Sequence, residues 1–334
     1  MLQWRFALNA SRRSDDAPVV SVIMPVYNGA QWLSAAVESV LAQTLTNLEV
    51  LIVDDASDDD TLEIAQRFAR LDARVHVLRN RVNRGQAAAR NVALSHARGV
   101  WVAPVDADDQ IRPDRLRRLV EAGEREGADL IADGILFEGE RQPGVPAELM
   151  TWGRNDQRLE QLSAEALIRS GFGGGCRSLG YLKPLMRRRF LEQCHLRYAE
   201  DLRFAEDFNL YVRALFCGAR FLLFPESHYV YWQTPESASR TEISRIAQDA
   251  VDNSQMLRAA VRGSESARVT AALDEYERRW QVLSWFEQMK RGLTERNARA
   301  VLKLLRRMPV SPRDIVRFAV GRVRMKRRGQ QESE

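Results

Sequence analysis

Three acidic residues are crowded at one point of the chain. Asp106, Asp108 and Asp109 directly follow the apolar run 101–105. Carboxylates this close together repel one another unless a cation neutralises them, and hard oxygen ligands suit Mg²⁺ or Mn²⁺ bridging a diphosphate. The pattern therefore predicts a divalent-cation site formed by these three residues. A solvated acidic turn that caps the next helix is the alternative for an isolated D-x-D.

Further polar residues follow other strand-like runs near the start of the chain. Asp54 and Asp55 end the run 48–53, where a carboxylate can accept hydrogen bonds from a nucleobase or ribose, or simply cap the next helix. Tyr27 follows the run 19–24 and could stack on a base or line a turn. Arg90 lies in the small-residue segment 85–91, where it could hold a diphosphate in fork geometry or be an ordinary surface arginine.

The elements that must position these residues alternate between strands and helices. Apolar, β-branched runs predict strands at 19–24 (stopped by Pro25), 48–53, 75–78 and 101–105, and helical spacing predicts helices between them, ending near 43, 70 and 97. This order is typical of an α/β fold with a doubly wound, mostly parallel sheet. Such sheets bind ligands beyond the carboxyl ends of their strands, so the polar clusters are expected at one edge.

The remainder is less regular and then becomes helical. A helix over 114–126, a strand over 129–137, a helix beginning near 208 and a strand over 219–224 are expected, with long loops at 138–158 and 171–175. From about 243 the pattern is helical, with breaks near Gly263, Gly292 and Pro309. We therefore expect one catalytic domain over 18–240, with halves at 18–112 and 113–240. A helical C-terminal appendage would follow over 241–334.

Composition limits the classes of protein. The 334 residues are 45% apolar, yet no run approaches the roughly 18 apolar residues of a membrane-spanning helix. Three cysteines without paired spacing support neither a disulfide framework nor a zinc site, and favour a reducing cytoplasm. The net charge of +5 comes from segment 313–328, where seven basic residues face one aspartate among apolar residues. This predicts an amphipathic tail on an anionic membrane surface rather than a nucleic-acid partner, although a solvated terminal helix is the alternative.

Together, segments 20–28, 49–61, 83–91 and 106–109 resemble the inverting nucleotide-sugar transferases of glycosyltransferase family 2, over about residues 18–240. The resemblance implies the A-type glycosyltransferase fold. Segments 180–184 and 205–208 are similar to bacterial exopolysaccharide enzymes of the succinoglycan glucosyltransferase type.

The resemblance also implies roles for individual residues. Pro25, Tyr27 and Asp55 would line the base pocket, and Arg90 would help hold the nucleotide. Asp106 and Asp108 would serve ribose and metal, with Asp109 sharing the metal. In the pair Glu206-Asp207, Asp207 would be the general base that deprotonates the acceptor hydroxyl. The earlier pair Glu200-Asp201 leaves Asp201 as an alternative base.

These roles imply a metal-dependent, non-processive glycosyltransferase that transfers one hexose at a time. The expected donor is UDP-glucose, and the transferred sugar is glucose. The acceptor would be a saccharide, either linked to a lipid such as a polyprenyl carrier or of another kind, in the biosynthesis of exopolysaccharide or another cell-surface glycan. The protein would then be cytoplasmic and peripheral on the inner face of the membrane. Processive synthases of this family carry Q-x-x-R-W, whereas segment 276–280 has Tyr276 in place of the glutamine. Segment 231–239 resembles the family's Ser-x-Ser loop, which closes over the diphosphate.

Two other functions are compatible with parts of this pattern. A nucleotidyltransferase also combines metal-binding acids with an α/β sheet, but no Gly- and Lys/Arg-rich phosphate loop follows Met24. A catalytically silent binding or scaffold protein would keep the sheet and dock through the tail. The intact acidic cluster and Glu206-Asp207 argue against that second alternative.

Overall fold

The first hundred residues form the predicted alternation of strands and helices. The computed structural model describes residues 17–139, 158–171, 179–233, 243–261 and 266–306. The alternating elements are, in order, β1 (Val20–Val26), α1 (Leu33–Leu41), β2 (Leu48–Asp54), α2 (Thr61–Leu71), β3 (Val75–Arg79), α3 (Gln86–His96) and β4 (Trp101–Pro104). β1 and β2 are buried along their whole length, as expected for parallel strands covered on both faces.

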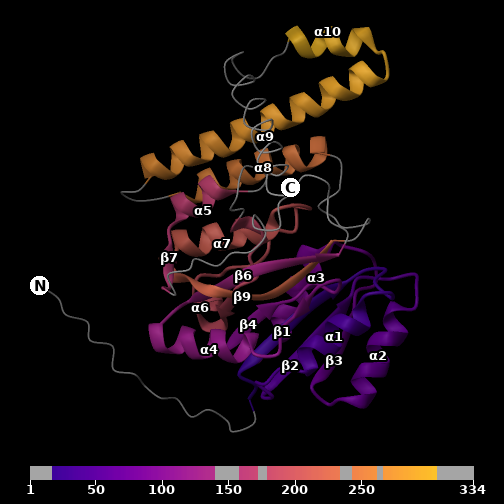
Figure 1. The fold of residues 1–334 in the computed structure, drawn as a ribbon, viewed down its shortest axis with the longest axis vertical. Coiled ribbons are helices and arrows are strands. Elements are labelled where there is room, and N and C mark those ends of the chain that lie inside the picture. Colours follow the sequence, from indigo (N-terminus) through magenta and orange to yellow (C-terminus); the bar gives the residue numbers. More distant parts are fainter. Residues whose placement is uncertain (1–16, 140–157, 172–178, 234–242, 262–265, 307–334) are drawn as a thin grey trace, which may run out of the picture.

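The second half of the described chain extends the same sheet with mixed strand directions. Its elements are β5 (Gln110–Ile111), α4 (Arg115–Glu126), β6 (Leu130–Gly139), β7 (Glu160–Leu162), α5 (Ala164–Ser170), the 3₁₀ helix η2 (Leu179–Tyr181), β8 (Leu185–Arg187), α6 (Arg188–Gln193), α7 (Glu206–Phe216) and β9 (Phe221–Gln233). The strand order is β3-β2-β1-β4-β8-β6-β9-β5, and β7 pairs with β9. β1, β2, β3 and β4 are mutually parallel and lie next to one another (Figure 1). β8 runs antiparallel to β4 and to β6.

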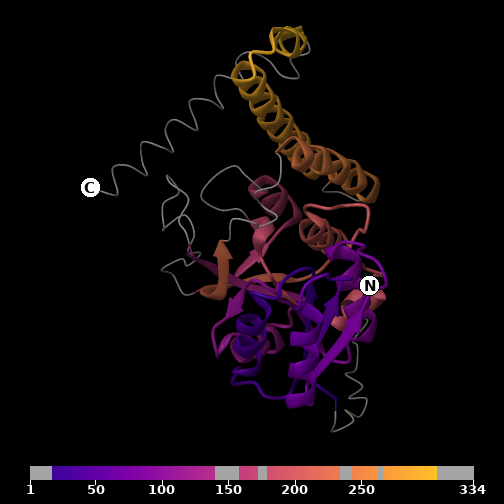
Figure 2. The same cartoon turned by 90° about the vertical axis from the view of Figure 1, so that its right-hand side faces the viewer.

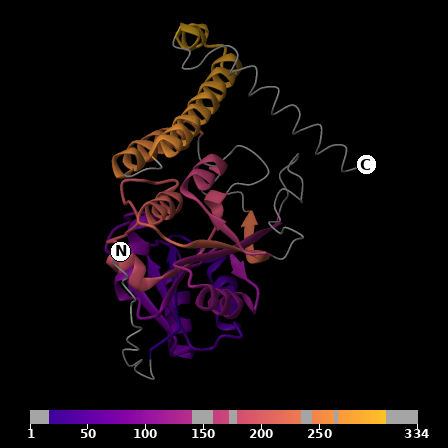
Figure 3. The same cartoon turned by 90° about the vertical axis from the view of Figure 1, so that its left-hand side faces the viewer.

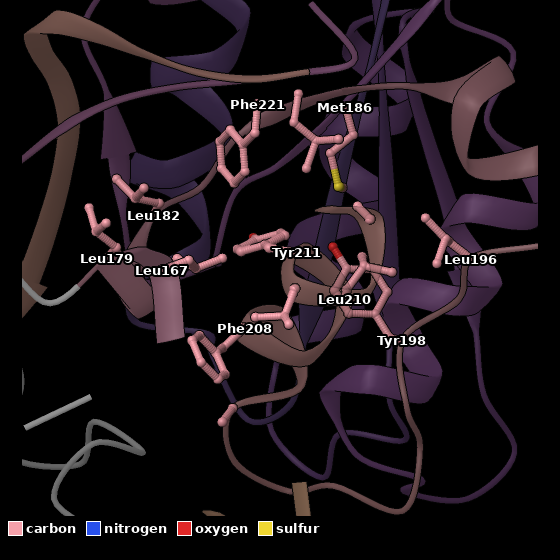
Figure 4. Close-up of a cluster of buried hydrophobic side chains, with 14 of the residues drawn as sticks. Leu167, Leu179, Leu182, Met186, Leu196, Tyr198, Phe208, Leu210, Tyr211 and Phe221 are labelled. Atoms are coloured by element: carbon pink, nitrogen blue, oxygen red, sulfur yellow. The ribbon is translucent and has the colours of Figure 1, made fainter. Parts of the chain in front are cut away.

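Two hydrophobic clusters cover the two faces of this sheet. Alternate residues of β1 enter different clusters: Val22 and Met24 pack with α1 and α4, and Ile23 packs with α3 and α7. Figure 4 shows part of the cluster that contains Ile23. In it, Phe208 and Tyr211 of α7 lie among leucines from several elements. The doubly wound architecture predicted from the sequence is therefore present.

One boundary differs from the prediction because of the strand register. Pro25 was expected to stop the first strand, but β1 continues to Val26. The carbonyls of Val19 and Ile23 accept hydrogen bonds from Trp101 and Val105, so odd-numbered residues of β1 face β4. β4 ends at Pro104, before the level of Pro25. Pro25 has no N–H, but no residue of β4 lies opposite it, so the sheet loses no hydrogen bond at this position.

The C-terminal helices pack onto the sheet domain. They are α8 (Ile243–Ala260), α9 (Ser266–Thr294) and α10 (Ala298–Arg306). α8 contacts α7 and α9 contacts α5, and α10 is the helix farthest from the sheet (Figures 1, 2 and 3). The ring of Tyr276 stacks on Phe208 with a centroid distance of 5.3 Å. The predicted appendage thus shares a hydrophobic core with residues before 240.

The break expected near Gly292 is present. α9 ends at Thr294, and the chain turns at Arg296, whose φ is 52°, before α10 begins at Ala298. In the parts of the chain that the structure describes, we find no helix that is both long and apolar enough to cross a membrane.

Candidate functional site

The acidic residues lie in the loop that leaves the carboxyl end of β4, which we call the acid loop (residues 105–109). The N–H of Asp106 donates to the Tyr229 hydroxyl at 3.2 Å, and the N–H of Asp109 donates to the Asp106 carbonyl at 3.1 Å. These bonds fold the loop into a tight turn against β9. The side chains of Asp106 and Asp108 remain partly exposed at the sheet edge where the sequence predicts a ligand.

Three carboxylates converge on the buried guanidinium of Arg90. Its terminal nitrogens lie 2.6 Å from Asp106 Oδ1, 2.5 Å from Glu206 Oε1 and 3.2 Å from Asp207 Oδ1. The Arg90 side chain is 1% exposed, and its guanidinium carbon lies 5.5 Å from the centre of the Tyr198 ring. Arg90 therefore joins the acid loop to the first turn of α7. Contact with a diphosphate stays a prediction that would require these ion pairs to change.

Lys183 makes a second bridge between the same two elements. Its Nζ lies 2.7 Å from Asp106 Oδ2 and 2.6 Å from Asp207 Oδ2. The Lys183 carbonyl accepts a hydrogen bond from Arg115 at 2.5 Å, and Arg115 pairs with Asp133 at 2.8 Å, both side chains being 0% exposed. Lys183 lies in segment 180–184, which contributes to the resemblance, but no role was predicted for its side chain, because nothing in the sequence shows that it meets Asp106 and Asp207.

The charges of this cluster do not balance. Five carboxyl groups (Asp106, Asp108, Asp109, Glu206 and Asp207) lie around two cationic side chains, Arg90 and Lys183. Burial, and next the charge of Asp106, raise the pKa of Asp108 to about 6. Burial alone would also raise the pKa of Asp106, but Lys183 and Arg90 outweigh it and hold that pKa well below its usual range. Ionisation of Asp108 is thus opposed both by its burial and by the neighbouring Asp106 carboxylate.

Glu206 shows the same effect inside the cluster. Burial, and next the neighbouring Asp207, raise its pKa above the ordinary value in spite of the Arg90 contact. Conversely, Asp106 and Asp207 outweigh the burial of Lys183 and raise the pKa of its ammonium. The lysine is therefore held in its charged form.

Asp109 occupies a different position from the other two acids of the loop. It is 1% exposed, and its carboxylate accepts hydrogen bonds from the Tyr229 hydroxyl at 2.7 Å and from the Trp232 N–H at 3.0 Å. Both oxygens thus fasten the acid loop to β9. That Asp109 also binds the metal stays a prediction. Its carboxylate would have to exchange at least one of these two hydrogen bonds for the metal.

The predicted nucleotide residues Asp54 and Asp55 are buried at the end of β2. Asp55 accepts hydrogen bonds from the side-chain amide of Asn80 and the N–H of Gly85, each at 2.7 Å. Asp54 lies 3.2 Å from Arg79 Nε. Both carboxylates therefore hold the connection between β3 and α3, and contact with a base stays a prediction.

Pro25 and Tyr27 lie at the end of the neighbouring strand. Pro25 is buried opposite Val53 of β2. Tyr27 is 47% exposed, so its ring is accessible for stacking.

The two candidate bases are clearly separated. Asp207 lies in the first turn of α7, within the cluster described above. Asp201 is exposed, and its neighbour Glu200 pairs with Arg84 at 2.7 Å. The geometry therefore favours Asp207 as the group that could act beside the acid loop. The predicted closing loop lies largely outside the described residues, at 234–239, as do the expected loops at 140–157 and 172–175 and the basic tail 313–328.

The acid loop suits a cation that is shared with a ligand. Within the described residues, no group of three or more His, Cys, Asp or Glu side chains is arranged to hold a metal by itself. Mg²⁺ is commonly bound by one or two carboxylates together with substrate phosphates and waters. Asp106 and Asp108 supply two carboxylates at an accessible edge, and a cation there would offset the repulsion between Asp106 and Asp108. These residues fit such a cation.

Comparisons with known proteins agree with this fold. Over 231 residues the chain is 38% identical to the succinoglycan biosynthesis protein ExoO of Rhizobium meliloti, an alignment that covers 68% of this chain and 64% of that protein. It is 37% identical to ExoU of the same organism over 213 residues, covering 63% and 60%. The chain thus spans somewhat less than two thirds of the length of these curated relatives.

Solved structures show the same fold. TarS 1-349 of S. aureus in complex with UDP-GlcNAc superposes with a TM-score of 0.64 and 21% identity, covering 86% of this chain and 79% of that one. A mannosyltransferase from Pyrobaculum calidifontis, in complex with GDP-Man and Mn²⁺, gives 0.56 at 21% identity, covering 92% and 80%. The predicted A-type glycosyltransferase fold is confirmed.

The family expected from the sequence is confirmed as well. The family model described as "Glycosyl transferase family 2" matches residues 21–178, which include the acid loop. The chain therefore carries a glycosyltransferase family 2 domain.

Proposed function

We propose that this protein is an inverting, metal-dependent glycosyltransferase that moves one hexose from a nucleoside-diphosphate sugar to a saccharide acceptor. One observation carries the proposal: Arg90 and Lys183 hold the acid loop after β4 and the Glu206-Asp207 pair of α7 in a single cluster. These ion pairs support the proposal, because they bring the acid loop, to which we assign the donor, next to a carboxylate that could act as the base.

Asp207 is the group that we assign to proton transfer. The acceptor hydroxyl oxygen forms a bond to the anomeric carbon while the bond from that carbon to the diphosphate oxygen breaks on the opposite face. The hydroxyl proton passes to the Asp207 carboxylate, and the electron pair leaves with the diphosphate. No covalent enzyme intermediate is needed, so the sugar carbon is inverted.

Tyr27 and the acid loop are the groups that we assign to the donor. Tyr27 offers an exposed ring for a nucleobase, beside the buried Pro25, Asp54 and Asp55. A divalent cation held by Asp106 and Asp108 would neutralise charge on the departing diphosphate. UDP-glucose is the donor that we propose, on the basis of the sequence resemblance to succinoglycan glucosyltransferases.

The acceptor follows from the relatives and the tail. Two relatives are named for succinoglycan biosynthesis, and we propose a lipid-linked saccharide of exopolysaccharide assembly as acceptor. Tail 313–328 would hold the protein on the anionic cytoplasmic face of the membrane. Flotation with liposomes containing anionic lipid tests this, and equal flotation of the full chain and a chain truncated before 313 would contradict it.

Transfer of a single sugar is part of the proposal. Tyr276 and Trp280, which stand where processive enzymes carry Q-x-x-R-W, are buried in the hydrophobic core. Their role is packing, with Tyr276 stacked on Phe208, one residue beyond Asp207.

The test is the release of nucleoside diphosphate from a panel of nucleotide sugars, with Mn²⁺ and with bacterial membrane extract as the source of acceptor. We expect turnover of one donor, loss of turnover with EDTA, and loss in Asp108→Asn. Donor binding without turnover under all conditions would favour the scaffold alternative. Release of pyrophosphate from a nucleoside triphosphate would instead favour a nucleotidyltransferase.

A further inference from the structure

Both oxygens of the Asp106 carboxylate are already in contact with cationic side chains. Oδ1 lies 2.6 Å from Arg90, and Oδ2 lies 2.7 Å from Lys183. A divalent cation that binds Asp106 must therefore compete with one of these two groups. Either Arg90 or Lys183 must move away from its Asp106 oxygen when the cation binds.

Arg90 is the more firmly held of the two. It contacts three carboxylates, its side chain is 1% exposed, and the Tyr198 ring lies beside its guanidinium. It also belongs to α3, whose backbone hydrogen bonds fix its position. Moving Arg90 would leave Glu206 buried without its cationic partner, which is strongly unfavourable.

Lys183 is held less firmly at its ammonium end. It contacts two carboxylates, its side chain is 8% exposed, and a flexible four-carbon stem carries its charge. Its backbone, in contrast, is fixed through the buried Arg115–Asp133 pair, because Arg115 donates to the Lys183 carbonyl. The ammonium can therefore shift between partners without movement of the chain.

We propose that Lys183 is the exchangeable counter-ion of Asp106: an incoming divalent cation displaces its ammonium from Asp106, while the ammonium stays with Asp207. Lys183 is then a positioning residue that links occupation of the acid loop to the placement of the candidate base. This inference rests on the proposed function, which assigns Asp106 to the cation.

The experiment measures Mn²⁺ binding to the full chain without donor, by the electron paramagnetic resonance signal of free Mn²⁺. Lys183→Met removes both the competitor and a positive charge beside the cation, so Mn²⁺ should bind at least about ten-fold more tightly, even with water-like screening. Lys183→Arg, which keeps the charge, should bind Mn²⁺ no more tightly than wild type. The exposed Lys290 offers a matched control, and Lys290→Met should behave like wild type.

A double variant controls for damage to the folded site. Lys183→Met combined with Asp207→Asn removes one cation and one anion, so the buried charge is unchanged, and Mn²⁺ should still bind more tightly than to wild type. General damage to the site would weaken binding, so a gain in affinity is a result that a merely structural role would not produce. Equal or weaker Mn²⁺ binding in both Lys183→Met and the double variant Lys183→Met/Asp207→Asn, or no binding in any protein, would overturn the inference. Because no donor is present, the result is separate from success or failure of the proposed transferase activity.

Discussion

Asp108→Asn should make the metal-free protein more stable. Burial and the charge of Asp106 raise the pKa of Asp108 from its ordinary 3.8 to about 6. Because the folded-state pKa is raised, the folded protein holds the Asp108 proton more tightly than the unfolded chain does, and ionisation costs stability as the pH rises. At about 1.4 kcal/mol per pKa unit, this cost is about 3 kcal/mol at pH 8 and about half of that at pH 5. An asparagine carries no such cost.

Urea unfolding in EDTA at pH 8 and pH 5 measures this difference. Asp108→Asn should exceed wild type in its free energy of unfolding by up to about 3 kcal/mol at pH 8, with a smaller gain at pH 5. Asp201→Asn is the matched control, because Asp201 is exposed and its loss should change stability by no more than about 0.5 kcal/mol. If Asp108→Asn is no more stable than wild type at pH 8, or its gain does not shrink at pH 5, the reasoning about the raised pKa of Asp108 is wrong.

Three further predictions concern other parts of the site. Tyr27→Ala should lose base stacking of about 1–3 kcal/mol and raise the donor KM by about 5- to 150-fold in steady-state assays, whereas Tyr27→Phe should stay near wild type; equal KM values would exclude stacking. Arg90→Met should lower the free energy of unfolding by about 3–5 kcal/mol, because buried carboxylates lose their partner, and unchanged stability in urea would contradict the ion-pair cluster. Tyr276→Ala should cost about 3–5 kcal/mol through the cavity beside Phe208, with one unfolding transition. Two separate transitions would show that α9 does not share the core.

The sheet that carries the site follows from local patterns. β1 to β4 were predicted from apolar runs, and their carboxyl ends bring Tyr27, Asp55 and Asp106 to one edge. The end of β1 was missed because it depends on where β4 stops, which the residues around Pro25 do not reveal. The end of α9 at Thr294, in contrast, lies close to the break predicted near Gly292.

The ion-pair cluster itself could not be predicted. Lys183 reaches Asp106 because β8 pairs antiparallel with β4, with Val102 opposite Met186, and a three-residue strand leaves almost no pattern in a sequence. Arg90 was expected to meet a diphosphate, yet its three carboxylate partners come from the acid loop and from α7, which are far from it along the chain. Which cation meets which carboxylate is decided by packing between elements rather than by spacing within them.

The most direct test of the assigned base compares Asp207→Asn with Asp201→Asn in donor binding and in nucleoside diphosphate release with acceptor present. We expect Asp207→Asn to bind the donor but to lose turnover by at least about 100-fold, while Asp201→Asn keeps both. Turnover retained in Asp207→Asn, or lost only in Asp201→Asn, would contradict the assignment of the acceptor's proton to the cluster that Arg90 and Lys183 hold together.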